Sequence, residues 1–229
     1  MKNFKKSLSK VIVLFFTSIF ILSACNSPVE SNNDNYSEDF SSILKEMELE
    51  DVNPTEMEGL IFMREEEKLA RDVYLVLYET WKVNVFSNIA KSEQKHTDAI
   101  KLLLEKYQIE DPVITDEIGV FQNSDLQSLY NSLIEKGKVS LVEALYVGAA
   151  IEEIDILDLE KNLAQVDSED IIFVYNNLMR GSRNHLRAFV KNLSAQGVEY
   201  QAQYLDEEQF QTIVSSGVEG GSRRGRGKR

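Results

Sequence analysis

The sequence is poor in the residues that most often reveal a protein's chemistry. Its 229 residues include one cysteine, two histidines, one tryptophan and three prolines. The single cysteine, Cys25, leaves no partner for a disulfide and excludes an iron–sulfur cluster or a zinc site built from several cysteines. Proline and glycine are also scarce in the long segments between Thr55 and Gly197, which favours long, uninterrupted helices.

Basic residues are few relative to acidic ones. The chain has 25 lysines and arginines against 38 aspartates and glutamates, a net charge of −13. Residues 1–24 contain four of the lysines and no acid, so without them the charge is 21 − 38 = −17. An acidic body suits the attraction of cations and argues against nucleic acid as a partner.

Long apolar runs are limited to residues 11–22, which are too few for a stable membrane-spanning anchor. The run follows a basic N-terminal region and ends in Leu22-Ser-Ala-Cys25, which resembles the lipobox of bacterial lipoproteins. The resemblance implies a signal peptide over residues 1–24, lipidation of Cys25, and a place in the cell envelope, anchored to the lipid bilayer on the extracytoplasmic side. An ordinary secretory signal and an uncleaved anchor are the alternatives.

The rest of the chain divides into three predicted parts. Residues 25–53 are polar and predict a flexible linker with a short helical turn near residues 40–47. Residues 54–197 predict one helical domain that is long enough to have its own core. Residues 198–229 form a C-terminal extension that ends in a basic tail of glycines and arginines.

Apolar periodicity and capping signals place the helices of the domain. Residues 55–58 and 140–143 have the Ser/Thr-x-x-Glu pattern of a capping box. The predicted helices are 55–82, 84–108, 125–136, 141–165 and 168–195. The four long helices match the lengths found in four-helix bundles. We therefore predict an all-α, up-down four-helix bundle, whose long crossover between its second and third long helices contains the short helix and allows those two helices to run parallel.

Polar residues interrupt the apolar face of each long helix near its middle. Because carboxylates that converge inside a protein repel one another, they must be protonated or neutralised by cations. Two divalent cations balance four carboxylates, and Glu93 and His96 have the E-x-x-H spacing that puts a carboxylate and an imidazole on one helix face. We therefore predict a site for two divalent metal ions. Its predicted ligands are Glu67, Glu93, His96, Glu152, Asp155 and His185.

The neighbours of these residues leave alternatives open. A different helix rotation would replace Glu67 by Glu66, and Glu153 competes with Glu152 in the same way. Four residues are predicted to support the ligands rather than bind metal: Arg71, Tyr74, Ser182 and Arg183. Surface ion pairs are the alternative for the two arginines, and core packing is the alternative for the tyrosine, which could otherwise donate a hydrogen bond or relay an electron.

The motifs resemble the metal-binding helices of rubrerythrins. The resemblance is carried by Glu67-x-x-Ala70-Arg71-x-x-Tyr74, Ile89-Ala90-x-x-Glu93-x-x-His96 and Gly148-x-x-x-Glu152-x-x-Asp155. Residues 55–195 are also similar to a ferritin-like family of uncharacterised bacterial and archaeal proteins, the domain of unknown function 2202. The resemblance implies a ferritin-like fold and a di-iron centre with oxidase, peroxidase or ferroxidase activity. Manganese and zinc are the alternative metals.

Two departures from the family pattern matter. Rubrerythrins carry a second E-x-x-H on their last bundle helix, whereas Ser182 stands three residues before His185 here, so Asp155 must supply the missing carboxylate. A mononuclear site and a metal-free polar network are the alternatives. The chain also has no CxxC unit, so an enzyme would need an external electron donor. The second functional hypothesis is a non-catalytic metal-binding or envelope interaction module.

Overall fold

The protein is all-α, as the sequence predicts. The structure, a computed structural model, describes residues 34–220, and all regular secondary structure within them is helical. The elements in chain order are α1 (Asp34–Glu46), α2 (Pro54–Trp81), α3 (Asn84–Lys106), α4 (Ser124–Gly137), α5 (Leu141–Leu163), α6 (Glu169–Ala195) and α7 (Glu207–Ser215). The predicted signal peptide, Cys25 and the basic tail beyond residue 220 lie outside the described residues. Within residues 34–220, no helix combines the length and apolarity that a membrane crossing requires.

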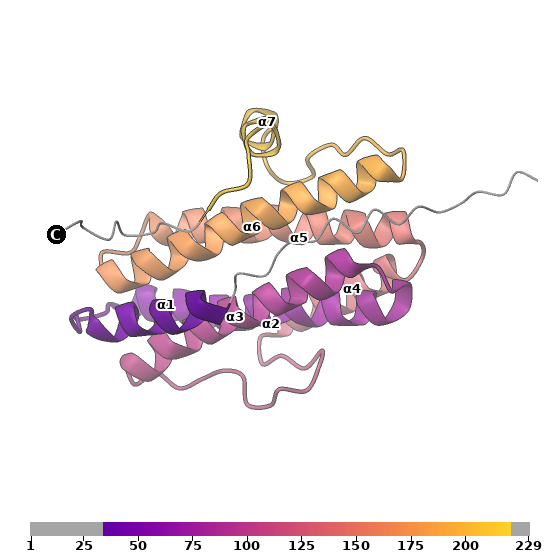
Figure 1. Cartoon of the computed structure of the whole chain (residues 1–229). Helices are drawn as coiled ribbons and strands as arrows, with labels where there is room; N and C mark the ends of the chain where they lie inside the picture. Colours follow the sequence, from indigo (N-terminus) through magenta and orange to yellow (C-terminus); the bar gives the residue numbers. More distant parts are fainter. Residues whose placement is uncertain (1–33, 221–229) are drawn as a thin grey trace, which may run out of the picture.

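The four long helices form two hairpins that face each other. Figure 1 shows α5 and α6 in one layer and α2 and α3 in the other. Lys106 at the end of α3 contacts Asp170 at the start of α6, and Phe86 near the start of α3 packs on Phe189 near the end of α6. These contacts make α3 and α6 antiparallel. Since α5 and α6 also form an antiparallel hairpin, α3 and α5 run parallel, which is the orientation that the long crossover allows.

The helix starts have clear chemical causes, although two differ from the predicted ones. The cap of α2 is Asn53. Its side-chain oxygen accepts a hydrogen bond from the backbone amide of Glu56, and the Glu56 carboxylate accepts one from the backbone amide of Asn53. The predicted box at residues 55–58 is wrong, because Pro54 begins the helix and lacks an N–H of its own. The cap of α4 is Asn123, so the helix begins at Ser124, one residue before the predicted start. Ser140 caps α5 by accepting from the amide of Glu143, as predicted.

Two helices lie in segments that were predicted to be linker or extension. The helix α1 is longer than the predicted turn, because Leu44 is buried and Phe40 stacks on Phe173 of α6 with ring centroids 5.2 Å apart. The helix α7 was not predicted. It is held by its buried residues Phe210 and Ile213, and it lies across the outer side of α6 (Figure 1).

The crossover from α3 to α4 is fixed to α2 by buried charges. Arg64 forms an ion pair with Asp111, and the Glu65 carboxylate accepts from the amides of residues 122 and 123. Lys68 and Asp72 form a buried ion pair at 2.6 Å. The Lys68 ammonium also donates to the carbonyls of residues 117 and 120, and Asp72 accepts from the amide of residue 119. One side of α2 therefore holds the crossover, which leaves its opposite side free to contribute to the interior.

Candidate metal centre

The structure brings the predicted ligands together between the two hairpins. Two groups, each with two carboxylates and one imidazole, have ligand atoms within 4.8 Å of one another. The groups are Glu67, Glu93 and His96, and Glu93, Glu152 and His185. We call them the His96 triad and the His185 triad. Because Glu93 belongs to both triads, the two groups form one continuous cluster with a shared carboxylate.

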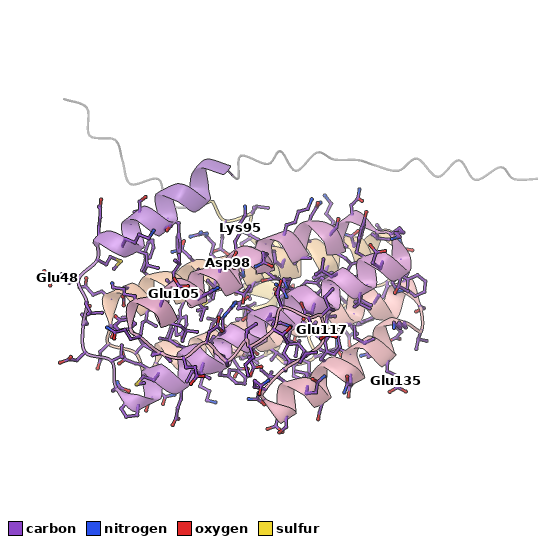
Figure 2. The ribbon with its side chains drawn as sticks, turned by 90° about the horizontal axis from the view of Figure 1, so that it is seen from below. Glu48, Lys95, Asp98, Glu105, Glu117 and Glu135 are labelled. Atoms are coloured by element: carbon purple, nitrogen blue, oxygen red, sulfur yellow. The ribbon has the colours of Figure 1, made fainter. Side chains whose placement is uncertain are left out.

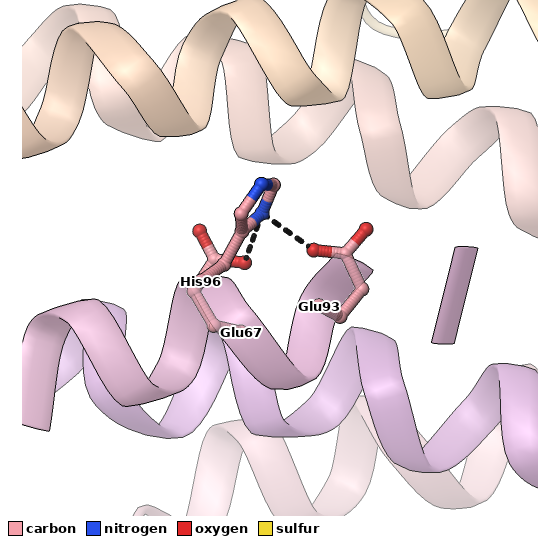
Figure 3. Close-up of side chains that lie close together, drawn as sticks. All are labelled: Glu67, Glu93 and His96. Atoms are coloured by element: carbon pink, nitrogen blue, oxygen red, sulfur yellow. Dashed lines mark hydrogen bonds and ion pairs between the residues drawn. The ribbon is translucent and has the colours of Figure 1, made fainter. Parts of the chain in front are cut away.

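The His96 triad joins α2 to α3. His96 Nδ1 lies 3.2 Å from Glu67 Oε2 and 2.7 Å from Glu93 Oε2. Figure 3 shows the imidazole directed between the two carboxylates, with one nitrogen facing both. Glu93 and His96 are three residues apart on α3, so the helix places them on one face, as the E-x-x-H spacing predicts. A single Nδ1 facing two carboxylate oxygens is a suitable geometry for a cation bound between them.

The His185 triad joins α3, α5 and α6. His185 Nδ1 lies 2.8 Å from Glu93 Oε1 and 3.4 Å from Glu152 Oε2. The two imidazole rings are 5.5 Å apart between centroids. Glu93 therefore presents its Oε2 to His96 and its Oε1 to His185, which is the arrangement of a carboxylate that bridges two positions.

Asp155 lies beside the triads rather than within either of them. Its Oδ2 accepts a hydrogen bond from the Ser182 hydroxyl, and its Oδ1 is buried without a hydrogen-bond partner. Ser182 stands on α6 three residues before His185, where the E-x-x-H pattern would have a glutamate, and it contacts the aspartate on α5. Through this hydrogen bond, Asp155 on α5 supplies a carboxylate beside the position on α6 where the sequence has a serine.

The chemistry of the cluster fits a metal ion. Four buried ligand atoms have no hydrogen-bond partner: Glu67 Oε1, Glu93 Oε1, Asp155 Oδ1 and His185 Nδ1. The close approach of Glu93 Oε1 to His185 Nδ1 is an ion-pair distance without hydrogen-bond geometry. Each unpaired buried polar atom costs about 1–3 kcal/mol. A cation would use these atoms as ligands, and mixed carboxylate and imidazole ligation suits iron, manganese or zinc.

Without a metal, the two imidazoles outweigh the effect of burial on the ionised form of Glu93 but not on those of the other carboxylates in the cluster. Burial lowers the pKa of His185, but the charges of Glu93 and Glu152 outweigh burial and raise the pKa to about 10. Glu93 is affected in the opposite sense: burial raises its pKa, yet the two imidazoles lower it far below its ordinary value. Burial and the charge of Glu152 raise the pKa of Asp155 to about 7. The pKa of Glu67 is also raised, by burial and by Asp155. Glu67, Glu152 and Asp155 therefore have too little positive charge around them to stabilise their ionised forms. Two divalent ions would supply that charge.

Tyr74 lies next to the cluster. Its hydroxyl donates to Glu152 Oε1 and is also 3.2 Å from the carbonyl oxygen of Gly148. Burial and the charge of Glu152 raise the pKa of this phenol well above its ordinary value, so the proton stays on the tyrosine. Tyr74 thus orients the carboxylate of the His185 triad.

The two arginines that were predicted to support the ligands bond to residues outside both triads. Arg71 bonds to Asp72, Gln94 and Asp116, and it belongs with the charges that hold the crossover. Arg183 forms an ion pair with Glu219 at 2.5 Å. The side of α6 that carries Arg183 faces the segment after α7, a segment that the sequence patterns did not place. Both arginines therefore form ion pairs with residues outside the two triads, and the Arg71 pair with Asp72 is buried rather than at the surface.

Glu66 and Glu153, the alternatives to two of the predicted ligands, both lie outside the triads. Glu153 is buried, but its carboxylate accepts from the Tyr200 hydroxyl and from the amides of residues 203–205, so it holds the chain before α7. Glu66 is buried outside the triads, with Oε2 unpartnered, and its pKa is raised by burial and by Asp155. Glu67 and Glu152 are therefore the members of each pair that face the histidines.

Gly181 was missed as a site residue. A Cβ at this position would lie 2.5 Å from His96 Cε1 and 2.6 Å from His96 Nε2. The His96 ring thus lies directly against the backbone of α6, which only glycine permits. The sequence did contain a clue. Gly181 precedes His185 by four residues, which places the glycine one helical turn from that ligand and on the same helix face.

Comparison with known proteins agrees with the family resemblance. The family described as an uncharacterised protein domain, DUF2202, matches residues 56–217. The chain belongs to this family. An uncharacterised DUF2202 relative, MJ0754 of Methanocaldococcus jannaschii, is 58% identical over 173 residues, which are 76% of this chain and 94% of that protein.

The fold of this DUF2202 chain also matches a solved structure. The crystal structure of the hypothetical protein MJ0754 superposes with a TM-score of 0.75 at 57% identity, covering 76% of this chain and 99% of that one. Neither name states an activity, a ligand or a cofactor. Function must therefore be argued from the cluster itself.

Proposed function

We propose that the protein is a ferritin-like, lipid-anchored metalloprotein whose centre binds two divalent metal ions, with iron as the active metal, and reacts with dioxygen or peroxide. The observation that carries the proposal is the pair of triads that share Glu93. A cluster of hydrogen-bonded side chains would leave few atoms unpaired, whereas here four ligand atoms are buried without a hydrogen-bond partner, although two of them lie at ion-pair distance from each other. The parallel orientation of α3 and α5 agrees with the single long crossover of ferritin-like folds.

Each residue has a definite role in this proposal. Glu67 and His96 would hold one ion, Glu152 and His185 would hold the other, and Glu93, which belongs to both triads, would contribute to both. Asp155, oriented by Ser182, is the fourth carboxylate, so that two divalent ions are balanced by four negative charges. Tyr74 fixes Glu152 by its hydrogen bond. When bound, iron supplies the redox chemistry, and the surrounding helices exclude bulk water from the carboxylates.

The reductant must come from outside the chain. Cys25 is the single cysteine, so there is no internal cysteine-ligated iron unit to deliver electrons. This observation also favours a second candidate function, in which the centre binds metal without turnover. Metal uptake without oxygen or peroxide consumption would select that second function.

The test of the proposed function is metal content. The full chain would be loaded anaerobically with Fe(II), and iron per chain compared with that of a His96→Ala/His185→Ala variant of the same helical content. We expect close to two irons per chain and a loss of both in the variant. Equal iron in the two proteins would refute the proposed centre. Oxygen and peroxide consumption by the loaded protein then distinguishes an enzyme from a metal-binding module.

The lipid anchor has its own test. A Cys25→Ser variant should lose the incorporation of labelled fatty acid and should move from the membrane fraction to the soluble fraction or remain unprocessed. Equal labelling of the variant and the parent chain would contradict lipidation at Cys25.

A further inference from the structure

A cavity of about 360 Å³ lies between α3 and α6, next to the two histidines of the candidate centre. One part of its wall is apolar and is formed by Phe40, Ala99, Leu102 and Leu178. The rest is mostly polar and comes from α1, α3 and α6, together with Glu219 from the segment after α7. Residues from four distant parts of the chain therefore line one partly open cavity.

The floor of the cavity is formed by the two histidines of the centre. His96 and His185 both line the cavity, and 12% and 11% of their side chains are exposed. The carboxylates of the triads are only 1–2% exposed. Gly181 also lines the cavity and lies against the Cε1–Nε2 edge of His96, whereas Nδ1 faces the carboxylates. A molecule in the cavity thus approaches the centre from the imidazole side.

The size of the cavity exceeds what dioxygen or peroxide requires. A water molecule occupies about 30 Å³ of the liquid, and the small oxidants are of similar size. Cavities that bind organic ligands measure about 300–1,000 Å³ and combine apolar walls with a few polar groups. The observed volume and lining fall within that class.

A lysine lies in the lining of the cavity, alongside the charged residues Asp98, Arg180 and Glu219. Lys95 lines it and forms no ion pair within residues 40–220, and Figure 2 shows Lys95 on the side of the molecule where α1 lies. The acidic residue Glu219 is neutralised by Arg183 and Arg187, which contact its two carboxylate oxygens. Asp98 is exposed and already accepts a hydrogen bond from Gln94. The ammonium of Lys95 is therefore available to an anionic group.

We propose that this cavity binds a small organic anion with an apolar body, placed beside His96 and His185 as the organic substrate of the centre. The role as substrate rests on the proposed function, whereas the binding itself does not. An iron-storage or ferroxidase site that handles only metal and oxidant would have no use for an apolar chamber of this size.

The test uses benzoate as the anionic probe and benzamide as its neutral analogue. Both would be titrated calorimetrically into the full chain in detergent, loaded with zinc so that no turnover occurs, and a detergent-only titration would be subtracted. Ser92→Trp fills the cavity one turn before His96. Lys91→Trp, at the adjacent exposed position, is the matched control.

We expect saturable binding of one benzoate per chain. Ser92→Trp should weaken benzoate binding by at least about tenfold. Lys95→Met should weaken benzoate binding by about tenfold, as expected for the loss of one charged hydrogen bond, and should leave benzamide binding unchanged. Lys91→Trp should bind as the parent chain does. Absence of saturable benzoate binding, or binding that Ser92→Trp does not change, would overturn the inference.

Zinc content keeps the two proposals separate. A parent chain that binds no zinc refutes the metal centre, while benzoate titration of the metal-free chain still decides the cavity. A chain that binds two zinc ions without benzoate refutes the cavity alone. If Ser92→Trp does not fold, judged by its helical signal, the comparison of Lys95→Met with the parent chain decides the outcome.

Discussion

Replacing Gly181 by alanine should empty one half of the metal centre and spare the other. The added Cβ would stand 2.5 Å from His96 Cε1, and ordinary contacts begin near 3.4 Å, so the ring must move by about 3.4 − 2.5 = 0.9 Å. The same Cβ lies 3.8 Å from His185 Cε1, which is an ordinary contact. The clash is therefore specific to the His96 triad.

A ring displacement of this size exceeds what metal coordination tolerates. Ligand distances in metal sites lie within about 0.2 Å of their ordinary values. Even changes to residues that only orient a ligand cost about 10–100-fold in affinity, so we expect a loss of at least that size for the ion held by His96. The ion held by Glu93, Glu152 and His185 should remain bound.

The assay is a metal titration that counts bound ions per chain, accompanied by urea unfolding of the metal-free protein. Gly59→Ala is the matched control. It adds a methyl to another helix glycine, 2.5 Å from the movable amide oxygen of Asn162 and away from the centre. We expect one bound ion for Gly181→Ala and two for Gly59→Ala. Retention of both ions at parental affinity in Gly181→Ala would refute the reasoning, and loss of both would refute the independence of the triads.

Three further predictions follow from other parts of the molecule. Glu153→Gln should lower the free energy of unfolding by about 2–4 kcal/mol, because a charged acceptor of the amides of residues 203–205 is lost, and it should leave the metal content unchanged; urea unfolding and metal analysis check both. Removing the metal with a chelator should lower the stability by about 2.7 kcal/mol for each ion lost, relative to free metal at 100-fold its Kd, and a calorimetric transition that does not move would contradict a metal site. Arg183 and Arg187 lower the pKa of Glu219 to about 2 from the ordinary 4.5, so this contribution is complete above pH 4.5 and is lost as the pH falls towards 2. Faster amide exchange of the segment after α7 over that interval, absent in Glu219→Gln, would show the effect.

The long helices and the inward-facing ligands were predictable from the sequence because both depend on local periodicity. Helix rotation follows from the apolar stripe, so Glu93 and His96 had to share a face. Ser140 could be identified as a cap because the cap hydrogen bond reaches only three residues along the chain. The choice between Glu66 and Glu67 was harder. The two differ by one helix position, and only the packing of α2 against α3 separates them.

Features that depend on distant contacts were not predictable. The carboxylate of Glu56 accepts from the amides of residues 167 and 168, more than 100 positions away, and so takes the place of a local cap at the start of α6. Arg183 was predicted to support the metal ligands, whereas its partner in the structure, Glu219, lies 36 residues further along the chain. No periodic pattern encodes pairings of this kind, since each needs the folded chain to bring its two members together.

The charges on the outer side of α2 have an effect on the opposite side of the same helix. Successive residues of an α-helix are separated by about 100° around its axis, so the pairs that fix the crossover also fix the direction in which Glu67 points. A change at Asp111 or in the chain around residue 119 would let α2 turn about its axis and would alter the distance from Glu67 to His96. Substitutions in a surface connection that binds no metal should therefore change which metal the interior prefers.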